Sequence, residues 1–127
     1  ELSVSFNLEH PLEVQTDPVI LGMIVSNLLS NAVAYTPEGG KISVDVAANN
    51  GTVCVDLSNT TDDLAPADLP NLFEKFWRKD RSDRGNNAHF GLGLPLVAAL
   101  SKALGVRVES SVPSRGQFRV RVLHPVQ

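Results

Sequence analysis

A long segment with helical periodicity, from about Pro18 to Tyr35, constrains the fold of this 127-residue chain more than any other feature. Asp17 is placed to cap the first turn, because its side chain can accept hydrogen bonds from the unpaired N–H groups there. Pro37 and the pair Gly39-Gly40 end the helix. The apolar residues of the segment form a broad surface, which other elements must cover. They are Val19, Ile20, Leu21, Ile24, Val25, Leu28, Leu29, Ala32 and Val33.

Shorter segments in which apolar and polar residues alternate predict strands, because successive side chains of a strand point to opposite faces. They are Ser3 to Leu8, Lys41 to Ala47, Val53 to Leu57, Val106 to Ser111 and Gln117 to Leu123. The triplet Asn49-Asn50-Gly51 predicts a tight hairpin between the second and third strands. A polar stretch from Ser58 to Asp63 follows the third strand, and Pro113 to Gly116 predicts a turn before the last one.

A second long helix is predicted from Leu92 to Leu104, with Gly105 placed to end it. One or two short helices are expected between Pro66 and Arg78, and Lys79 to His89 has the composition of a mobile loop. This order of elements requires the long helices to cover one face of the sheet. We therefore predict a single domain, 1–127, of the α+β class. It is a two-layer sandwich whose mixed, mostly antiparallel sheet is covered on one face by helices.

The composition is that of an ordinary soluble domain, with 43% hydrophobic and 20% charged residues. A formal net charge of -3 gives no electrostatic reason to expect a nucleic-acid partner. We expect no apolar stretch as long as the roughly 20 residues that a helix needs to cross a bilayer. We therefore expect no direct contact between this domain and a membrane. The single cysteine, Cys54, lies in an apolar run and is expected to be a small buried hydrophobe.

Asn27 and Asn31 are the first candidates for a functional site. They are four residues apart in the long helix, so their amides lie on one face, one above the other. Asn is a poor residue for the interior of a helix, because its side chain competes for backbone hydrogen bonds. Two readings stay open for the pair alone. Both amides could be exposed or bonded to a nearby loop, or they could bind Mg²⁺ through oxygen and phosphate through NH₂.

The run Gly91-Leu92-Gly93-Leu94, at the start of the second helix, is the next candidate. Glycines allow close approach of a ligand to backbone N–H groups, and a helix N-terminus favours phosphate. The alternative is a helix that begins in a tightly packed place. The spacing matches neither a P-loop nor the fingerprint of a dinucleotide-binding fold.

Basic residues gather in the segment between these two helices. Arg78, Lys79, Arg81 and Arg84 could fold onto phosphates as part of a lid. Taken alone, the segment favours the alternative of a solvated surface loop, because two aspartates in it already neutralise half of the basic charge.

Three sequence boxes, in register over essentially the whole chain, resemble those of the ATP-binding catalytic domain of bacterial sensor histidine kinases. The run Asn27-Leu28-Leu29-Ser30-Asn31-Ala32, followed by Tyr35-Thr36-Pro37, resembles the N-box of that family. Leu72 to Arg78 resembles the F-box, and Gly91 to Leu94 resembles the second glycine box. The resemblance implies the Bergerat ATP-binding fold, which DNA gyrase, mismatch-repair and heat-shock ATPases share.

The resemblance also implies a ligand, ATP with Mg²⁺, and a set of roles. Asn31 would coordinate the metal, and Asn27 would stand where hydrolysing relatives carry a catalytic Glu. With Arg78, these two asparagines are the expected catalytic residues. The expected nucleotide-binding residues are Asn27, Asn31, Tyr35, Asn59, Asp63, Leu64, Phe76, Arg84, Gly91, Leu92, Gly93 and Leu94.

The implied reaction is transfer of the γ-phosphate of ATP to a histidine, catalysed by a protein-histidine kinase. The acceptor histidine would lie on a separate helical dimerisation domain of the same kinase, so the isolated domain is not expected to autophosphorylate. A downstream response regulator is the second expected partner. The domain is expected in the cytoplasm, as one part of a longer kinase whose parent protein could be anchored in the inner membrane.

The first glycine box departs from the pattern of the family. Asn59, Thr61 and Asp63 stand where Asp, Gly and Gly are usual. Ala34 and His89 replace a basic residue and a lid glycine. These changes leave open a second function, that of a degenerate module that binds nucleotide weakly or not at all and serves in regulation. A third reading, a hydrolysing or serine-kinase relative, is disfavoured because such relatives carry Glu at position 27.

Overall fold

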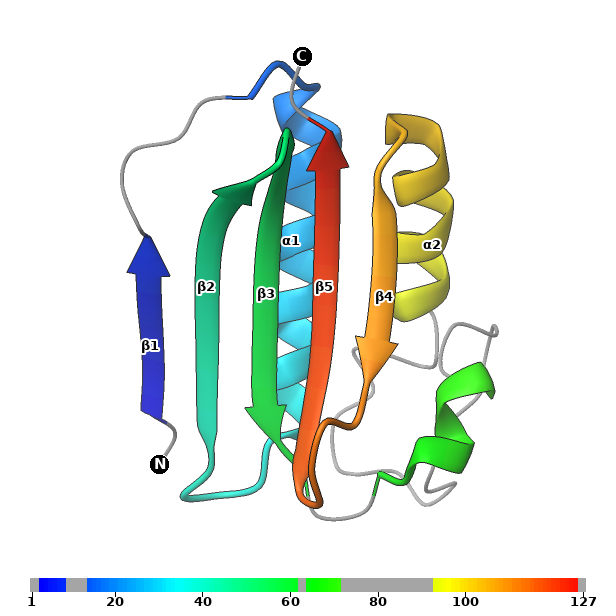
Figure 1. Ribbon diagram of the computed structural model, residues 1–127. Coiled ribbons are helices and arrows are strands. Elements are labelled where there is room, and N and C mark those ends of the chain that lie inside the picture. The colour runs from blue at the N-terminus through cyan, green and yellow to red at the C-terminus, as the bar shows by residue number, and fades with distance from the viewer. Residues whose placement is uncertain (1–2, 9–13, 62–63, 72–92, 126–127) are drawn as a thin grey trace.

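A five-stranded mixed sheet forms one layer of the molecule (Figure 1). The computed structural model describes residues 3–8, 14–61, 64–71 and 93–125. The strands are β1 (Ser3–Leu8), β2 (Lys41–Asn49), β3 (Thr52–Thr60), β4 (Arg107–Ser111) and β5 (Gln117–Pro125). Their order across the sheet is β1-β2-β3-β5-β4. Only β1 and β2 pair in parallel, whereas the other neighbouring strands are antiparallel, as predicted.

Two long helices form the second layer, on one face of the sheet (Figure 1). They are α1 (Pro18–Tyr35) and α2 (Gly93–Leu104), and the short 3-10 helix η1 covers Pro66–Asn71. Side chains from both helices, from strands β2, β3 and β5, and from Val106 just before β4 form one hydrophobic cluster between the layers. Its buried members are Ile24, Leu28, Ala32, Ile42, Val44, Leu57, Leu94, Val97, Val106, Phe118, Val120 and Val122. The predicted α+β sandwich is confirmed.

Local capping chemistry fixes the ends of the two long helices. The side chain of Asp17 accepts hydrogen bonds from the N–H groups of Val19 and Ile20, at 3.0 and 3.2 Å. At the other helix, the N–H groups of Gly105 and Val106 donate to the carbonyl of Ser101. Both ends agree with the sequence, because a helix cap is decided by residues within one turn of it.

The hairpin between β2 and β3 also forms where its residues predict it. Asn50 and Gly51 take positive φ angles of 52° and 78°, as a two-residue hairpin turn requires. The prediction for the strands themselves was too short. β2 extends through Asn49 instead of ending at Ala47, and β3 runs on to Thr60 instead of ending at Leu57. Pairing with neighbours on both sides holds the polar end of β3 in the sheet.

Two further expectations need correction. Cys54 is half-buried, not fully buried, because it alternates with the buried Val53 and therefore points to the face opposite α1 and α2. The chain also contains an apolar stretch longer than expected. Among the described residues, α1 is the one helix long and apolar enough to cross a bilayer by length and composition, which is weak evidence. In the fold, its buried side packs against the sheet through Ile24, Leu28 and Ala32.

Several predicted segments lie wholly or partly outside the described residues. Of the helical stretch predicted from Pro66 to Arg78, the structure describes only η1. The loop predicted from Lys79 to His89 and the first residue of the second predicted helix, Leu92, belong to the same undescribed range.

Candidate functional site

Asn27 and Asn31 lie on one flank of α1, between its buried side and its exposed side. The buried side carries Ile24, Leu28 and Ala32, and the two asparagines are half-buried beside it. This position follows from the helical period, because residues four apart fall on one face. The sequence predicted the shared face correctly.

The two amides differ in their hydrogen bonds. Nδ2 of Asn27 donates to the backbone carbonyl of Met23 at 2.7 Å, one turn earlier in the helix. This bond holds the amide in place and leaves its oxygen as the open acceptor. Asn31 forms no side-chain hydrogen bond within the part of the chain that the structure describes. A half-buried amide without such a bond can turn both its oxygen and its NH₂ group to a ligand.

The junction after α1 is held by close backbone packing. The Thr36 hydroxyl donates to the carbonyl of Ala32 at 2.5 Å, and the Gly40 N–H donates to the carbonyl of Pro37 at 2.8 Å. A Cβ atom on Gly40 would lie 2.4 Å from Cγ2 of Thr36 and 2.8 Å from the carbonyl oxygen of Pro37. Only glycine fits there. The junction thereby fixes the end of the helix, where the half-buried Tyr35 is the last residue.

Asn59 is a buried polar residue on the helix-covered face of β3, with 4% of its surface exposed. It pairs with Ile42 of β2 and Phe118 of β5, which are both buried in the hydrophobic cluster. Its Nδ2 donates to the carbonyl of Thr60 at 2.9 Å. Because only the NH₂ end of an amide can face a carbonyl, this bond leaves the Asn59 oxygen as an acceptor for another group.

The remaining described candidates lie around the same hydrophobic cluster. Leu64 is half-buried and packs against it. Gly93 is the first residue of α2, and the side chain of Leu94 is buried in the cluster. Leu94 can therefore meet a ligand only through its backbone. The other candidates lie outside the described residues. They are Asp63, Phe76, Arg78, Arg84, Gly91 and Leu92.

The fold brings two of the predicted segments to the same end of the molecule. The last turns of α1 and the end of β3 lie toward the lower end of Figure 1, and α2 runs upward from about the middle of the sheet. The resemblance implied one nucleotide site for these segments, but residue spacing could not show it, because the segments are far apart in the chain. Thr61, whose N–H donates to the carbonyl of Gly116 at 3.0 Å, is buried at this end as well.

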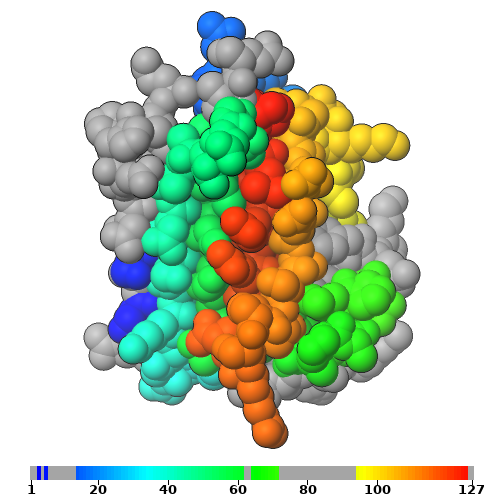
Figure 2. Space-filling view, in the orientation of Figure 1, coloured from blue at the N-terminus to red at the C-terminus, as the bar shows by residue number. Residues whose placement is uncertain are grey.

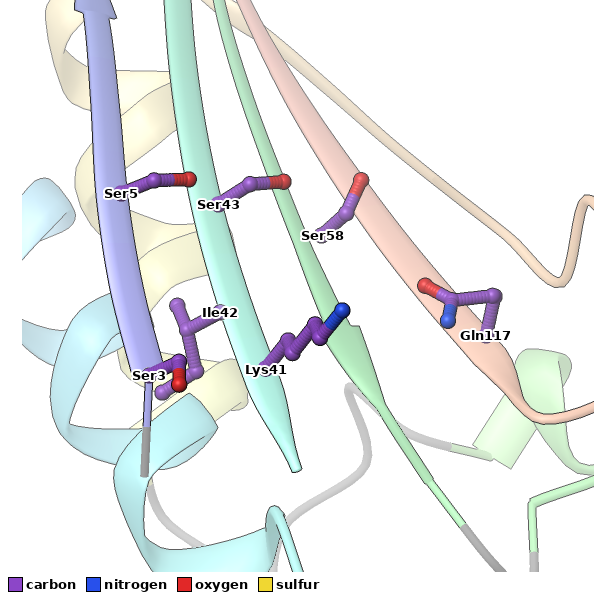
Figure 3. Close-up of a pocket in the computed structure, with 7 residues that line it drawn as sticks. All are labelled: Ser3, Ser5, Lys41, Ile42, Ser43, Ser58 and Gln117. Carbon is purple, nitrogen blue, oxygen red and sulfur yellow. The ribbon is translucent and has the colours of Figure 1, made fainter. Parts of the chain in front are cut away.

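None of the helices that the structure describes covers the opposite face of the sheet (Figure 2). A shallow depression of about 330 Å³ lies on this face, near the same end. Ser5, Ser43 and Ser58 stand in one row across three strands, with Lys41 and Gln117 beside them (Figure 3). This depression could not be found from the sequence, because its lining depends on the register of the strands. The sheet separates it from the asparagine flank of α1.

An ion pair crosses the open face beside the depression. Nε of Arg119 lies 2.9 Å from both carboxylate oxygens of Asp56, and Arg121 lies 3.7 Å from the same carboxylate. The hydrogen bond to Asp56 raises the pKa of Arg119 above its ordinary value. The pair joins β3 to β5, so we assign it to the stability of the sheet.

Solved structures with the same fold define the class of the protein. The catalytic domain of histidine kinase ThkA superposes with a TM-score of 0.82 at 20% identity, over 98% of this chain and 79% of that chain. Full-length ShkA, solved in complex with AMPPNP, matches with a TM-score of 0.82 at 26% identity, over 98% of this chain and 26% of that chain. The fold is therefore that of histidine kinase catalytic domains.

Sequence comparisons agree with the structures. Residues 16–127 match the family described as histidine kinase-, DNA gyrase B- and HSP90-like ATPases. The sensor histidine kinase CusS of Escherichia coli O6:H1 is 39% identical over 111 residues, which are 87% of this chain and 23% of CusS. The chain belongs to this ATPase family, as an ATP-binding catalytic domain of the sensor histidine kinase type. It spans about a quarter of the length of the curated relatives it matches.

Proposed function

We propose that this domain binds Mg-ATP and donates the γ-phosphate to a histidine on another domain of a protein-histidine kinase. The observation that carries the proposal is the position of Asn31. It is half-buried in the last turns of α1, it has no side-chain hydrogen bond among the described residues, and these turns lie toward the end of the molecule where β3 ends. The family match and the AMPPNP complex of ShkA support a nucleotide as the ligand.

The donors present fit Mg²⁺ bound through its nucleotide. The described residues contain no group of three or more His, Cys, Asp and Glu side chains that could hold a metal ion by themselves. Mg²⁺ does not need such a group, because it commonly keeps several waters and takes one or two protein oxygens together with substrate phosphates. In this proposal the Asn31 oxygen is the protein ligand. The ion would neutralise charge on the phosphates.

Asn27 favours phosphate transfer over hydrolysis. Its amide cannot accept a proton as a carboxylate does, so it cannot activate a water molecule as a general base. Transfer to an imidazole needs no such base on this helix, because a neutral imidazole nitrogen is already a nucleophile. The contribution of Asn27 is then to position the phosphates, with its amide fixed by the bond to Met23.

The other predicted residues complete the proposed site. Asn59, Asp63 and Leu64 are assigned to the adenine end, and Tyr35 to the phosphates or the sugar. Phe76, Arg78 and Arg84 are assigned to the segment that closes over the phosphates, with Arg78 also counted among the catalytic residues. Backbone N–H groups from Gly91 to Leu94 would bind phosphate at the start of α2.

We also propose a place for the domain in a longer polypeptide. The relatives are about four times as long as the matched region, so the acceptor histidine and its helical dimerisation domain would lie elsewhere in the same kinase. A response regulator would take the phosphate next. The domain itself would work in the cytoplasm.

Calorimetric titration with ATP and a non-hydrolysable analogue, with and without Mg²⁺, tests the proposal. We expect binding that Mg²⁺ strengthens, and we expect Asn31→Ala to weaken Mg-ATP binding by roughly tenfold or more, since loss of about 1.4 kcal/mol is tenfold in affinity. Ser26→Ala, on the exposed side of the same helix, is the matched control. Absence of binding by the wild-type domain at millimolar Mg-ATP would instead identify a degenerate regulatory module.

A further inference from the structure

Thr61 is a buried residue whose hydroxyl has no hydrogen-bond partner among the described residues. It is 7% exposed. Its backbone N–H donates to the carbonyl of Gly116, but its side chain forms no hydrogen bond within the part of the chain that the structure describes. Buried hydroxyls are normally hydrogen-bonded, because burial without a bond costs free energy. The hydroxyl of Thr61 therefore indicates a partner that the described residues do not supply.

The backbone at Thr61 is free of strain. Among the described residues other than glycine, only Asn50 has a positive φ. A positive φ would be costly for threonine, because its side chain is branched at Cβ. The chain thus accepts Thr61 at a position where the pattern of the family has glycine, and it gains there a hydroxyl that glycine lacks.

Thr61 lies on the same side of the sheet as Asn59. It directly follows β3, and its bond to Gly116 continues the pairing of Thr60 with Gln117. Residues two apart along an extended chain point to the same face, roughly 6 to 7 Å from each other. The amide of Asn59 leans toward Thr61, because its Nδ2 donates to the carbonyl of Thr60, which lies between them in the chain.

Gly116 leaves room beside Thr61. It stands opposite Thr61 in the continued pairing and has no side chain, and its φ of 84° favours glycine. Among the described residues, a Cβ atom added to Gly116 would meet only the carbonyl oxygen of Thr61 within 4 Å, at 3.7 Å. The side of Thr61 that faces β5 is therefore not filled by its paired residue.

We propose that Thr61 binds the adenine base together with Asn59. Its hydroxyl donates a hydrogen bond to a ring nitrogen beside the amino group of the base, and the oxygen of Asn59 accepts a hydrogen bond from that amino group. Adenine fits this pair, because its amino donor lies between two acceptor nitrogens, N1 and N7. This role rests on the proposed function, since it requires a bound adenine nucleotide.

The surroundings of Thr61 favour a base over a phosphate group. The open group of Asn59 is an acceptor, and a phosphate offers only acceptors, so the two would repel each other. The residues that pair with Asn59, Ile42 and Phe118, are buried in the hydrophobic cluster. An apolar wall beside two polar groups suits the flat ring and the polar edge of a purine.

Thr61→Val removes the hydroxyl and keeps the branched shape of the side chain. Calorimetry on the 127-residue chain should show an affinity for ATP that is about threefold to tenfold lower, which corresponds to the loss of one hydrogen bond. The melting temperature of the nucleotide-free chain should not fall, because no internal hydrogen bond is lost. Thr61→Ser keeps the hydroxyl and should recover the affinity. Thr52→Val, at the other end of β3, is the matched control.

Two nucleotide analogues identify the atom that accepts from Thr61. A CH group replaces N1 in 1-deaza-ATP and N7 in 7-deaza-ATP, so each analogue lacks one of the two acceptors. For the analogue that lacks the partner of Thr61, the affinities of Thr61→Val and the wild-type chain should agree within about twofold. For the other analogue, the affinity of Thr61→Val should again be about threefold to tenfold lower.

Three results would overturn the role of Thr61. The first is equal affinity of Thr61→Val and the wild-type chain for ATP. The second is an equal loss for ATP and for both analogues, which would show that the hydroxyl does not bond to a ring nitrogen. The third is a lower melting temperature of nucleotide-free Thr61→Val, which would assign the hydroxyl to the fold. All three leave the proposed function intact, whereas absence of ATP binding by the wild-type chain would overturn both.

Discussion

Asn31 and Asn59 are half-buried or buried amides at the edge of the hydrophobic cluster, where polar groups are costly unless they are bonded. The sequence identified Asn31 from its spacing with Asn27, which is a local property of a helix. It identified Asn59 only through the resemblance to a family. The structure adds that Asn59 lies on the helix-covered face of β3 and that its amide is oriented by the carbonyl of Thr60.

Asn59→Leu tests the adenine end of the proposed site. The change replaces the amide by an apolar group of similar size, so stability should change by less than about 1.5 kcal/mol. Affinity for ATP should fall by roughly tenfold, because the acceptor for the base is lost. Calorimetry measures the affinity for ATP with Mg²⁺ and for ADP without Mg²⁺. The affinity of Asn59→Leu should be reduced in both measurements, whereas that of Asn31→Ala should be reduced only when Mg²⁺ is present. Ser58→Ala, the adjacent residue on the open face, is the control, and unchanged binding by Asn59→Leu would remove Asn59 from the site.

Single residues also show where sequence reasoning works and where it fails. Asp17 was predicted as a helix cap and is one, because a cap depends on neighbours within one turn. Cys54 was predicted to be buried and is half-buried. The apolar residues beside Cys54 predict a strand, but they do not show which face of that strand the helices cover.

At the scale of elements, the two long helices and the hairpin were predictable and the end of β3 was not. Helical periodicity, caps and the Asn-Gly pair act within a few residues, so the sequence contains them directly. Ser58 and Asn59 have no strong preference for a strand, and Thr60, which does favour one, is the last residue of β3. All three residues are held in a strand because they lie between two paired neighbours. Ser58 and Asn59 pair with Ser43 and Ile42 of β2, and the three pair with Arg119, Phe118 and Gln117 of β5.

Two glycine substitutions separate a packed junction from an open helix surface. Gly40→Ala should destabilise the domain by about 1–3 kcal/mol, because its Cβ would overlap Thr36 and the backbone of Pro37. Gly22→Ala should stabilise it by about 0.5–1 kcal/mol, because the site is open and Ala favours a helix. Urea denaturation followed by circular dichroism measures both. Equal effects of the two changes would contradict the packing described for the junction after α1.

At the scale of the whole molecule, the two faces of the sandwich differ in charge and in cover. The helix α1 carries no charged residue, whereas the uncovered face of the sheet carries charged side chains such as Asp56, Arg119 and Arg121. The strands of that face lie toward the viewer in Figure 2. Neither face could be assigned from the sequence alone. Alternation shows that a strand has two faces, but only the arrangement of all the elements decides which of them the helices cover.

The isolated domain should bind ATP without phosphorylating itself. The expected acceptor histidine lies on another domain, and His124, the described histidine, is buried with Nδ1 2.8 Å from the carbonyl oxygen of Pro125. Incubation with γ-labelled ATP, followed by denaturing gel analysis before and after acid treatment, measures this. Full-length kinase is the positive control. Stable acid-labile phosphate on the 127-residue chain would show that the acceptor is present within it.

The sequence by itself determined the class of fold, the caps of both long helices, the hairpin and the pairing of Asn27 with Asn31 on one flank. These properties depend on contacts within a few residues or on the repeat of a helix or strand. Only the tertiary structure decided that the last turns of α1 and the end of β3 come to one end of the molecule. It also decided that one side of α1, with Val19 and Val33, is exposed to solvent, while charged residues lie on the face of the sheet opposite the helices. The reason is physical: burial is a property of the packed layers, and no local pattern fixes which surfaces those layers leave uncovered.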